Sequence, residues 1–444
     1  MYSLRLFFAP LLVIVATLSS PVAWAGISAG IAVVDITPPL GGLRVGYGSP
    51  IPSEGVQVPL TARVMVLESG ETSVALVVWD LCVAGSPWLH ERVAELGIDR
   101  LLLLNTHTHS GPHLDQPDFP ASGGTLRADT EKKVLAAIKE AQAAAFPASF
   151  AAAEGSIQLG YNRLERRPGG SVTHFDNPER IPYGPVDPTL GVIRVTDGQG
   201  VVRAVLVNYA CHPVVLGPTN RHLSPDYPGV MRREVEAAVG GSAVCFFLQG
   251  AAGEINPLML GRSGDAEKDL AVVETMGKTL ATEVIQVLAT LQSTPGKSDD
   301  VRMATKTFAV ENRWESVRKS DEPQQLEMPW RLKSISVSAT TLLVNGDIGI
   351  LALPGEPFQA FQGEWRQKSG LPHAYLLGYC AHPGDPWAGY IPDVESAARG
   401  GFGASDSTHV AVGTGERLVT EGLIQLYRLQ GRLRAEPKRH LREE

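Results

Sequence analysis

Two histidines separated by a single residue, His107 and His109, follow an apolar run of four leucines at residues 101–104. We expect the leucines to form a buried strand, and alternate side chains of an extended segment share one face. Both imidazoles can therefore point the same way from the end of this strand, and adjacent imidazoles suit a zinc ion. The alternative is that both rings only cap and hydrogen-bond the loop, so other segments must supply further ligands.

Other apolar runs also lead into side chains that bind metals. His212 comes shortly after a predicted strand at residues 201–209, and Glu356 follows the apolar run 348–353. The carboxylate of Glu356 could instead cap a predicted helix at residues 358–368. Two or three histidines with one carboxylate form a catalytic zinc site, which keeps one coordination position for water. Because such a site lowers the pKa of that water to about 7, the combination predicts hydrolysis.

The elements that must position these residues alternate between strands and helices along much of the chain. We expect strands at residues 28–35, 62–67, 73–79, 101–104, 148–159, 190–195, 201–209, 243–248, 301–310, 332–338, 341–344 and 348–353. We expect helices at residues 87–96, 126–145, 228–239, 265–291, 358–368 and 415–429. A long loop should occupy residues 160–187 and a glycine-rich segment residues 378–407. The pattern predicts an α/β fold of mixed β-sheets flanked by helices, in one large catalytic domain at residues 26–430 with active-site loops at strand ends.

Composition and charge narrow the class of protein. The chain has 444 residues, is 44% hydrophobic and carries a formal net charge of −8. Its charged residues are spread along the sequence and do not form blocks of like charge. It can therefore bury a large core, and it has no basic patch for nucleic acid. Its four cysteines lie in or beside apolar runs, where small buried thiols are expected rather than disulfides. They are Cys82, Cys211, Cys245 and Cys380. The sequence carries no signal for an oligomeric state.

The first 25 residues follow the pattern of a secretory signal peptide. Arg5 precedes an apolar run at residues 6–18, and Ala23-Trp24-Ala25 has the small-x-small form of a cleavage site. The apolar run is shorter than the roughly 20 residues that a membrane span needs. We therefore expect cleavage near Ala25 and an exported protein, periplasmic or extracellular. Residues 431–444 are highly charged and should form a frayed tail.

Six short motifs occur in one order along the chain. They are NTHTHSGP at 105–112, NYACHP at 208–213, SPDYPG at 224–229, GAAGEINP at 250–257, PGEPF at 354–358 and GYIPDVES at 389–396. This series resembles the catalytic domain of the neutral/alkaline (non-lysosomal) ceramidase superfamily. The similarity covers most of residues 26–430. Members of that family hydrolyse the amide bond of an N-acylsphingosine at a zinc ion held by two histidines, a glutamate and a tyrosine.

The resemblance implies a ligand set for this chain. On the matching positions, the zinc ligands would be His107, His212, Glu356 and Tyr390. His109 would lie beside the metal as a hydrogen-bonding or proton-transfer group. The same comparison matches Arg163 to an arginine that lines the family's pocket, where a guanidinium suits a developing oxyanion.

Two of these assignments have alternatives, and the chain also departs from the family pattern. Tyr390 could be a packed loop aromatic, and Arg163 could belong to a surface ion pair. Asn256 stands where the family has a serine with an assigned nucleophilic role, so a serine-ester mechanism is not available there. Phe402 stands where the family has a tyrosine, so one hydrogen-bond donor to the reacting carbonyl is missing. Ceramidases typically continue into a C-terminal β-sandwich, and we expect the surroundings of the pocket to differ here.

The leading expectation is an exported zinc hydrolase that cleaves an N-acyl amide through metal-activated water. The substrate would be a small molecule or a lipid resembling ceramide, and a lipid substrate implies transient contact with a membrane surface. One alternative is a two-metal phosphoesterase or amidohydrolase that uses neighbouring acids such as Asp115 and Asp226. Another is a catalytically inactive exported binding protein, suggested by the hydroxyl groups lost at Asn256 and Phe402.

Overall fold

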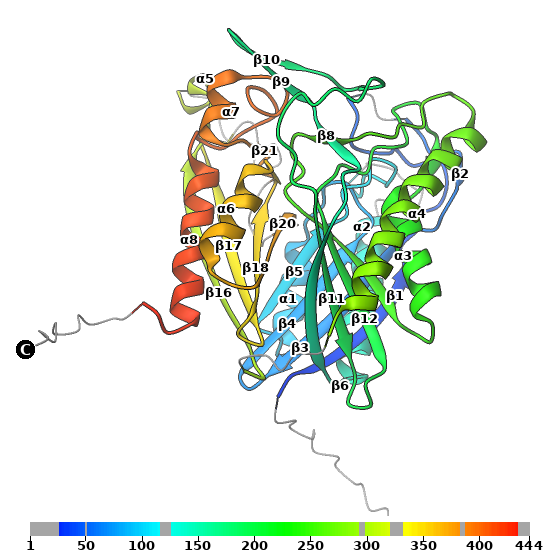
Figure 1. Ribbon diagram of the computed structural model, residues 1–444, viewed down its shortest axis with the longest axis vertical. Helices are drawn as coiled ribbons and strands as arrows, with labels where there is room; N and C mark the ends of the chain where they lie inside the picture. The colour runs from blue at the N-terminus through cyan, green and yellow to red at the C-terminus, as the bar shows by residue number, and fades with distance from the viewer. Residues whose placement is uncertain are drawn as a thin grey trace, which may run out of the picture.

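A nine-stranded β-sheet forms the centre of the computed structural model, which describes residues 26–48, 51–115, 126–292, 298–319, 332–381 and 387–433 (Figure 1). Its strands are β1 Ser28–Asp35, β3 Thr61–Ser69, β4 Thr72–Trp79, β5 Arg100–Asn105, β6 Phe146–Pro147, β16 Val301–Glu311, β17 Ser334–Val344, β18 Ile348–Pro354 and β20 His373–Ala381. They run in the order β16-β17-β18-β20-β5-β4-β3-β1-β6. The sheet is mixed, because β4 with β5 and β18 with β20 are parallel pairs among antiparallel ones.

A second, four-stranded sheet packs against the first. Its strands are β7 Ser149–Ser156, β11 Thr189–Thr196, β12 Val202–Tyr209 and β14 Val244–Gln249, in the order β14-β12-β11-β7. Alternate side chains of a strand point to opposite faces, and the inward-facing residues of the two sheets meet in one apolar core. In that core Met65 and Leu76 of the large sheet belong to the same cluster as Leu206 and Phe246 of the small one.

Helices cover the outer face of each sheet, which gives four layers (Figure 1). On the large sheet these are α1 Pro87–Glu95, α2 Leu126–Ala143, α6 Ala360–Ser369 and α8 Thr414–Leu429. On the small sheet they are α3 Tyr227–Val239 and α4 Ala266–Thr290. Two short helices, α5 Glu315–Arg318 and α7 Val394–Arg399, lie outside these layers. The predicted class, mixed sheets flanked by helices, is confirmed.

Local sequence signals explain where the long helices begin and how closely they pack. Ser86 caps α1 by accepting a hydrogen bond from the Leu89 amide at 3.0 Å, and Pro87 takes the first helical position, where an N–H is not needed. A Cβ atom at Gly30 of β1 would lie 1.7 Å from the carbonyl oxygen of Ala141 in α2. Only glycine therefore lets α2 lie this close to the sheet.

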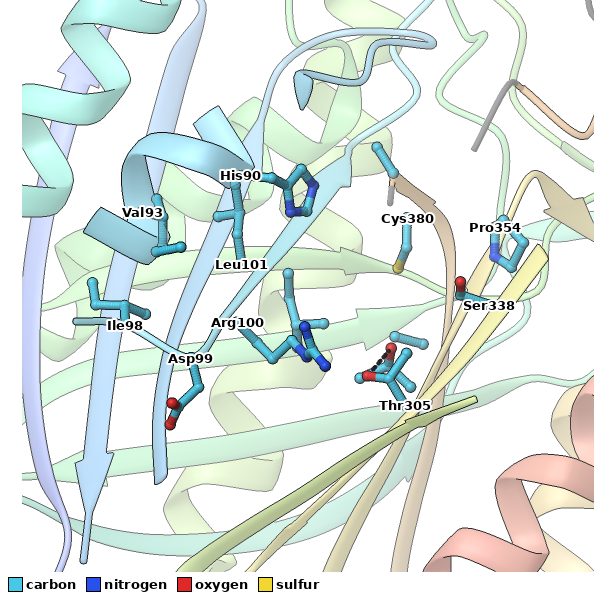
Figure 2. Close-up of a pocket in the computed structure, with 15 residues that line it drawn as sticks. His90, Val93, Ile98, Asp99, Arg100, Leu101, Thr305, Ser338, Pro354 and Cys380 are labelled. Atoms are coloured by element: carbon cyan, nitrogen blue, oxygen red, sulfur yellow. Dashed lines mark hydrogen bonds between the residues drawn. The ribbon is translucent and has the colours of Figure 1, made fainter. Parts of the chain in front are cut away.

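The large sheet has a seam where β20 meets β5. The two strands pair only through Cys380 with Leu104 and Ala381 with Leu103, whereas β20 pairs with β18 over most of its length. A pocket of about 110 Å³ opens beside this seam, between α1 and β5 on one side and β16, β17 and β18 on the other (Figure 2). The seam joins the two halves of the sheet close to the loops that follow β5 and β18.

Short ladders shape the loops at one end of the sheets. They pair β2 Gly55–Val56 with β13 His222–Leu223, β8 Gly160–Asn162 with β15 Ile255–Pro257, β9 Leu164–Arg167 with β10 Gly170–Thr173, and β19 Glu356–Pro357 with β21 Tyr390–Ile391. Figure 1 shows β8, β9, β10 and β21 gathered at the same end. The expectation of one long loop at residues 160–187 is thus wrong in part, because β8, β9 and β10 lie within it.

Two further element predictions were also wrong. β17 is one continuous strand rather than two, because Ser338 and Thr340 stay in the ladder and their hydroxyls hydrogen-bond those of Thr307 and Thr305 on β16 at 2.8 Å and 3.0 Å. The other miss is β20, which has no counterpart among the expected strands and extends into the segment expected to be a glycine-rich loop.

The predicted signal peptide at residues 1–25 lies outside the described residues, as do residues 434–444 of the predicted tail. Within the described ranges, no helix is both long enough and apolar enough to cross a bilayer. All four cysteines are free thiols, as expected, with Cys380 partly buried and the other three fully buried.

Candidate metal centre

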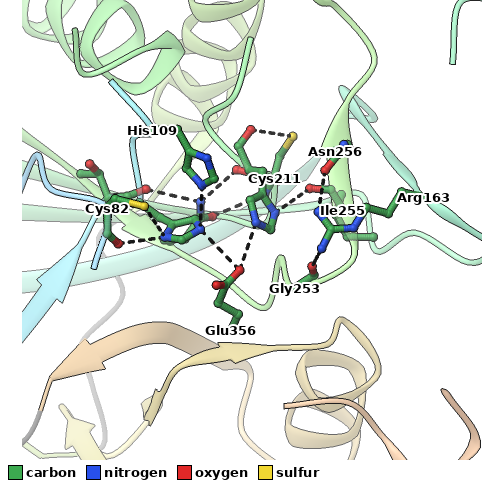
Figure 3. Close-up of polar contacts among 12 residues, drawn as sticks. Cys82, His109, Arg163, Cys211, Gly253, Ile255, Asn256 and Glu356 are labelled. Carbon is green, nitrogen blue, oxygen red and sulfur yellow. Dashed lines mark hydrogen bonds and ion pairs between the residues drawn. The ribbon is translucent and has the colours of Figure 1, made fainter. Parts of the chain in front are cut away.

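Three buried side chains from three different strand ends converge on one point. His107 follows β5, His212 follows β12, and Glu356 opens the short β19, separated by one residue from the end of β18. Their exposed fractions are 2%, 1% and 5%. The Glu356 Oε2 atom lies 3.4 Å from Nε2 of His107 and 3.1 Å from Nε2 of His212. The structure thus brings together three of the residues that the sequence suggested as ligands, around the carboxylate labelled in Figure 3.

Backbone carbonyls orient both imidazoles. Nδ1 of His107 lies 2.8 Å from the carbonyl oxygen of Cys82, and Nδ1 of His212 lies 3.2 Å from that of Ile255. A carbonyl can only accept a hydrogen bond, so each Nδ1 carries the proton and donates it. In the neutral form of each ring the lone pair is therefore on Nε2, facing Glu356, which is the tautomer that a metal ligand needs. Burial alone would lower the pKa of His107, but Cys82 and Glu356 outweigh burial and raise it well above its ordinary value, so an ion bound here would displace a proton from this ring.

The electrostatics of the cluster also suit a cation. Burial alone would raise the pKa of Glu356, but the imidazoles of His107 and His212 outweigh burial and hold that pKa well below its usual range. Burial lowers the pKa of His212 to about 4. The carboxylate is therefore ionised and the His212 ring neutral near pH 7, and these are the protonation states that bind metals.

The donor set fits a divalent metal ion such as zinc. The three donor atoms of His107, His212 and Glu356 lie within 4.8 Å of one another. A tetrahedral zinc ion with bonds of about 2.0–2.1 Å holds its ligand atoms roughly 3.3 Å apart, close to the separations from Glu356. A second group that could hold a metal, Cys82 with His107 and His109, shares His107 with the first. The described residues therefore favour one ion at this point rather than two independent ions.

The backbone conformation between the two histidines of the HxH segment differs from the expected one. We expected an extended segment, but His107 lies beyond β5 with φ of 68°, in the left-handed region. The rings nevertheless approach each other, with Nε2 of His109 3.1 Å from Nε2 of His107. Nδ1 of His109 is buried and has no hydrogen-bond partner among the described residues. Burial lowers the pKa of His109, so the structure places a neutral imidazole beside the cluster.

Arg163 is buried, with an exposed fraction of 3%, so it is not the surface ion-pair residue considered as the alternative. Its guanidinium donates to Oδ1 of Asn256 at 3.1 Å and to the carbonyl oxygen of Gly253 at 2.7 Å (Figure 3). Three aromatic rings surround the guanidinium carbon, at 5.8 Å for Phe175, 5.2 Å for Tyr390 and 4.9 Å for Phe402. Asn256 is thus a hydrogen-bond partner of this arginine.

A two-residue ladder brings Tyr390 to the cluster. Tyr390 is directly paired with Glu356 in the parallel β19–β21 ladder. Its hydroxyl interacts with both the Glu356 carboxylate and the Arg163 guanidinium, and its ring lies nearly parallel to that of His212 at a centroid distance of 6.5 Å. Phe402 packs edge-on against Tyr390 with centroids 5.5 Å apart.

Tyr379 is a neighbour of the cluster that we did not predict from the sequence. Its ring centroid lies 4.4 Å from that of His107 and 6.2 Å from that of His212. Burial raises the pKa of the Tyr379 phenol, which therefore stays protonated. From the sequence alone, this tyrosine would be predicted to be a core residue, because it lies in an apolar run. The only signal for a role at the site is that it shortly precedes the motif at 389–396.

The acids considered for a second metal lie elsewhere. Asp226 accepts hydrogen bonds from the amides of Leu216 at 3.0 Å and Tyr227 at 2.7 Å, where it caps α3. Asp115 forms an ion pair with Arg127. Neither carboxylate belongs to the groups of described residues that could share a metal ion.

Comparisons with known proteins show which solved structures share this fold. No protein family model matches the chain, and no curated protein does so either. The chain is similar to the crystal structure of neutral ceramidase from Pseudomonas aeruginosa, with a TM-score of 0.70, 17% identity and coverage of 94% of this chain and 76% of that one. It is also similar to a structure described as ceramidase complexed with C2, with a TM-score of 0.68, 18% identity and coverage of 94% and 77%. The chain therefore has a neutral ceramidase-like fold, as the six sequence motifs predict.

Proposed function

We propose that this protein is an exported zinc-dependent hydrolase that cleaves a linear N-acyl amide, such as that of a ceramide-like lipid. One observation carries the proposal: two imidazole nitrogens and an ionised carboxylate meet at one buried point next to a buried arginine. The ceramidase-like fold supports the choice of an amide as the bond that is cleaved.

The metal would be held by His107, His212 and Glu356, with Tyr390 as the fourth ligand. When bound, a zinc ion supplies Lewis acidity and a water molecule whose pKa is lowered to about 7. The neutral imidazole of His109 is placed to accept a proton at Nε2 and to return it to the leaving nitrogen of the amide. This cycle would leave His109 unchanged after each turnover.

Arg163 would stabilise the negative charge that develops on the carbonyl oxygen. Its guanidinium is already held by Asn256 and Gly253, so little reorganisation is needed when charge appears. Asn256 has no nucleophilic hydroxyl, and we assign it the role of orienting Arg163. The amide would then be attacked directly by water, without an acyl-serine intermediate.

The test combines metal analysis with turnover of a panel of N-acyl amides. We expect one zinc per chain, loss of turnover after chelation, and recovery when zinc is restored. His212→Ala and Glu356→Gln should lose zinc and lower kcat/KM by at least about 1,000-fold, which corresponds to about 4 kcal/mol of transition-state stabilisation. His373→Gln, which changes a histidine paired with Glu154, is the matched control and should keep both zinc and turnover.

Three results would contradict the proposal in different ways. Unchanged turnover in His212→Ala would reject this centre as the active site. Two metals per chain would favour the two-metal phosphoesterase. Tight binding of amides by the zinc-loaded protein without any turnover would indicate a binding protein. Export is tested separately, by sequencing the N-terminus of the secreted protein, which should begin near Gly26.

A further inference from the structure

The backbone of β20 is distorted at Tyr379. Between the pairs Ala352–Leu377 and Pro354–Cys380, β18 contributes one residue and β20 contributes two. Tyr379 is one of those two residues, and its φ of 59° lies in the left-handed region, which is unfavourable for a bulky side chain. A bulge of this kind re-aims a side chain, and strained residues gather at functional sites. The distortion turns Tyr379 toward the imidazoles of the candidate metal centre.

The hydroxyl of Tyr379 is buried without a partner. The residue has an exposed fraction of 0%, and its oxygen has no hydrogen-bond partner among the described residues. A buried hydroxyl that makes no hydrogen bond costs free energy, so such a group calls for a specific reason. The ring packs on His107 with centroids 4.4 Å apart, and burial together with the charge of Glu356 raises the pKa of the phenol, so the hydroxyl keeps its proton. The unpaired donor therefore belongs to a side chain that packs directly against the imidazoles of the candidate metal centre.

We propose that the Tyr379 hydroxyl donates a hydrogen bond to the carbonyl oxygen of the substrate as the amide carbon becomes tetrahedral. This inference rests on the proposed amide hydrolysis. Tyr379 reaches the centre from β20, a strand that supplies none of the three side chains proposed to hold the metal, and the neighbouring Phe402, which packs on Tyr390, has no hydroxyl to donate. Arg163 and Tyr379 would then share the developing negative charge, and donors aimed at that charge lower the barrier more than they tighten substrate binding.

The first test is the substitution Tyr379→Phe in the full, zinc-loaded chain. Phenylalanine keeps the ring that packs on His107 and removes only the hydroxyl. We expect kcat for an N-acyl amide to fall by about 100-fold, with KM within about threefold and zinc content unchanged. The matched control is Tyr209→Phe, because that hydroxyl accepts a hydrogen bond from the Leu159 amide at 2.9 Å and donates to the Ile157 carbonyl at 3.0 Å. The control should lose stability and keep kcat.

The second test measures binding instead of turnover. The probe is a phosphonate analogue of the same amide, in which a tetrahedral phosphorus replaces the carbonyl carbon, titrated by calorimetry into the zinc-loaded proteins. We expect Tyr379→Phe to weaken binding of the phosphonate by about 10- to 100-fold, while Tyr209→Phe binds it like the wild type. If the hydroxyl had a purely structural role, its removal would not selectively weaken binding of the phosphonate.

Each other outcome overturns a defined statement. Wild-type kcat and wild-type phosphonate affinity in Tyr379→Phe would reject the role of Tyr379 and leave the proposed function intact. Loss of zinc from Tyr379→Phe would make the tyrosine a support for the metal ligands, which also rejects the donor role. Failure of the wild type both to cleave the amides and to bind the phosphonate would reject the proposed function, and the inference would fall with it.

Discussion

Three aromatic rings and two hydrogen bonds hold the guanidinium of Arg163 in one orientation beside the candidate metal centre. A planar guanidinium can stack on rings and donate in two directions at the same time, whereas an ammonium is a point charge on a flexible stem. The residue type at this position should therefore matter as much as its charge.

We predict that Arg163→Lys lowers kcat by about 100-fold while zinc content stays at the wild-type value. The lysine keeps the positive charge but cannot hold both Asn256 and Gly253 in the same geometry. Steady-state kinetics with metal analysis measure the effect. The control is Arg166→Lys, because Arg166 is exposed and pairs with Glu395 at the surface. Equal kcat in both variants would show that Arg163 acts through charge alone or not at all.

Single residues were predictable from the sequence where their type is unusual for its surroundings. Histidines and a glutamate at the ends of apolar runs stand out, and His107, His212 and Glu356 do lie together in the structure. Tyr379 does not stand out, because an aromatic residue in an apolar strand is usually part of the core. Its relevance follows from a left-handed backbone and a missing hydrogen bond, and neither can be seen in a sequence.

Helix α2 shows how one position controls the contact between two elements. At Gly30 a Cβ atom would meet the backbone of Ala141, which cannot move aside as a flexible side chain could. We predict that Gly30→Ala displaces α2 from β1 and destabilises the protein by about 3 kcal/mol or more, at the upper end of the cost of overpacking. Urea denaturation measures this change in the free energy of unfolding.

The matched control for that prediction is Gly363→Ala. Gly363 is exposed in α6, and nothing lies within 4 Å of a Cβ atom added there. The same substitution should therefore stabilise the protein by about 0.5–1 kcal/mol, because alanine favours a helix. Similar effects at both positions would mean that the close approach of α2 is not what Gly30 provides.

Elements were predicted best where the hydrophobic period is regular. The expected strand at residues 28–35 matches β1, and most of the other expected elements begin or end within a few residues of the observed ones. The failure to predict β20 has a physical cause. The strand ends in a bulge and a tyrosine with a left-handed backbone, next to a glycine-rich stretch, so its sequence has no regular hydrophobic period. The ladder that pairs Glu356 with Tyr390 is set by tertiary packing and has no local signal.

At the scale of the whole molecule, an ion pair links the two sheets. Nδ1 of His373, at the start of β20, lies 3.0 Å from Glu154 on β7, and the Tyr375 hydroxyl donates to the same carboxylate at 2.8 Å. The hydrogen bond to Glu154 raises the pKa of His373 above its ordinary value of 6.5. A raised folded-state pKa stabilises the protein fully below the unfolded pKa, and that contribution disappears as the pH rises through the folded pKa.

We therefore predict that His373→Gln destabilises the protein more at about pH 6 than at about pH 9. Urea midpoints of both proteins at the two pH values measure the difference. In a Glu154→Gln background the imidazole has no carboxylate partner, so the same substitution should show little dependence on pH. A pH-independent effect in the wild-type background would assign the stabilisation to packing instead of charge.

The seam between β5 and β20 has a consequence for how the molecule matures. His107 comes from one side of the seam, Glu356 from the other, and His212 from the smaller sheet. Both histidines precede Glu356 by more than 140 residues in the sequence, so a nascent chain that contains the histidines still lacks the carboxylate of the candidate metal centre. Under the proposed function, all three groups could hold an ion only after β18 and β20 have docked beside β5, so metal content would report that the two halves of the large sheet and the smaller sheet have assembled correctly.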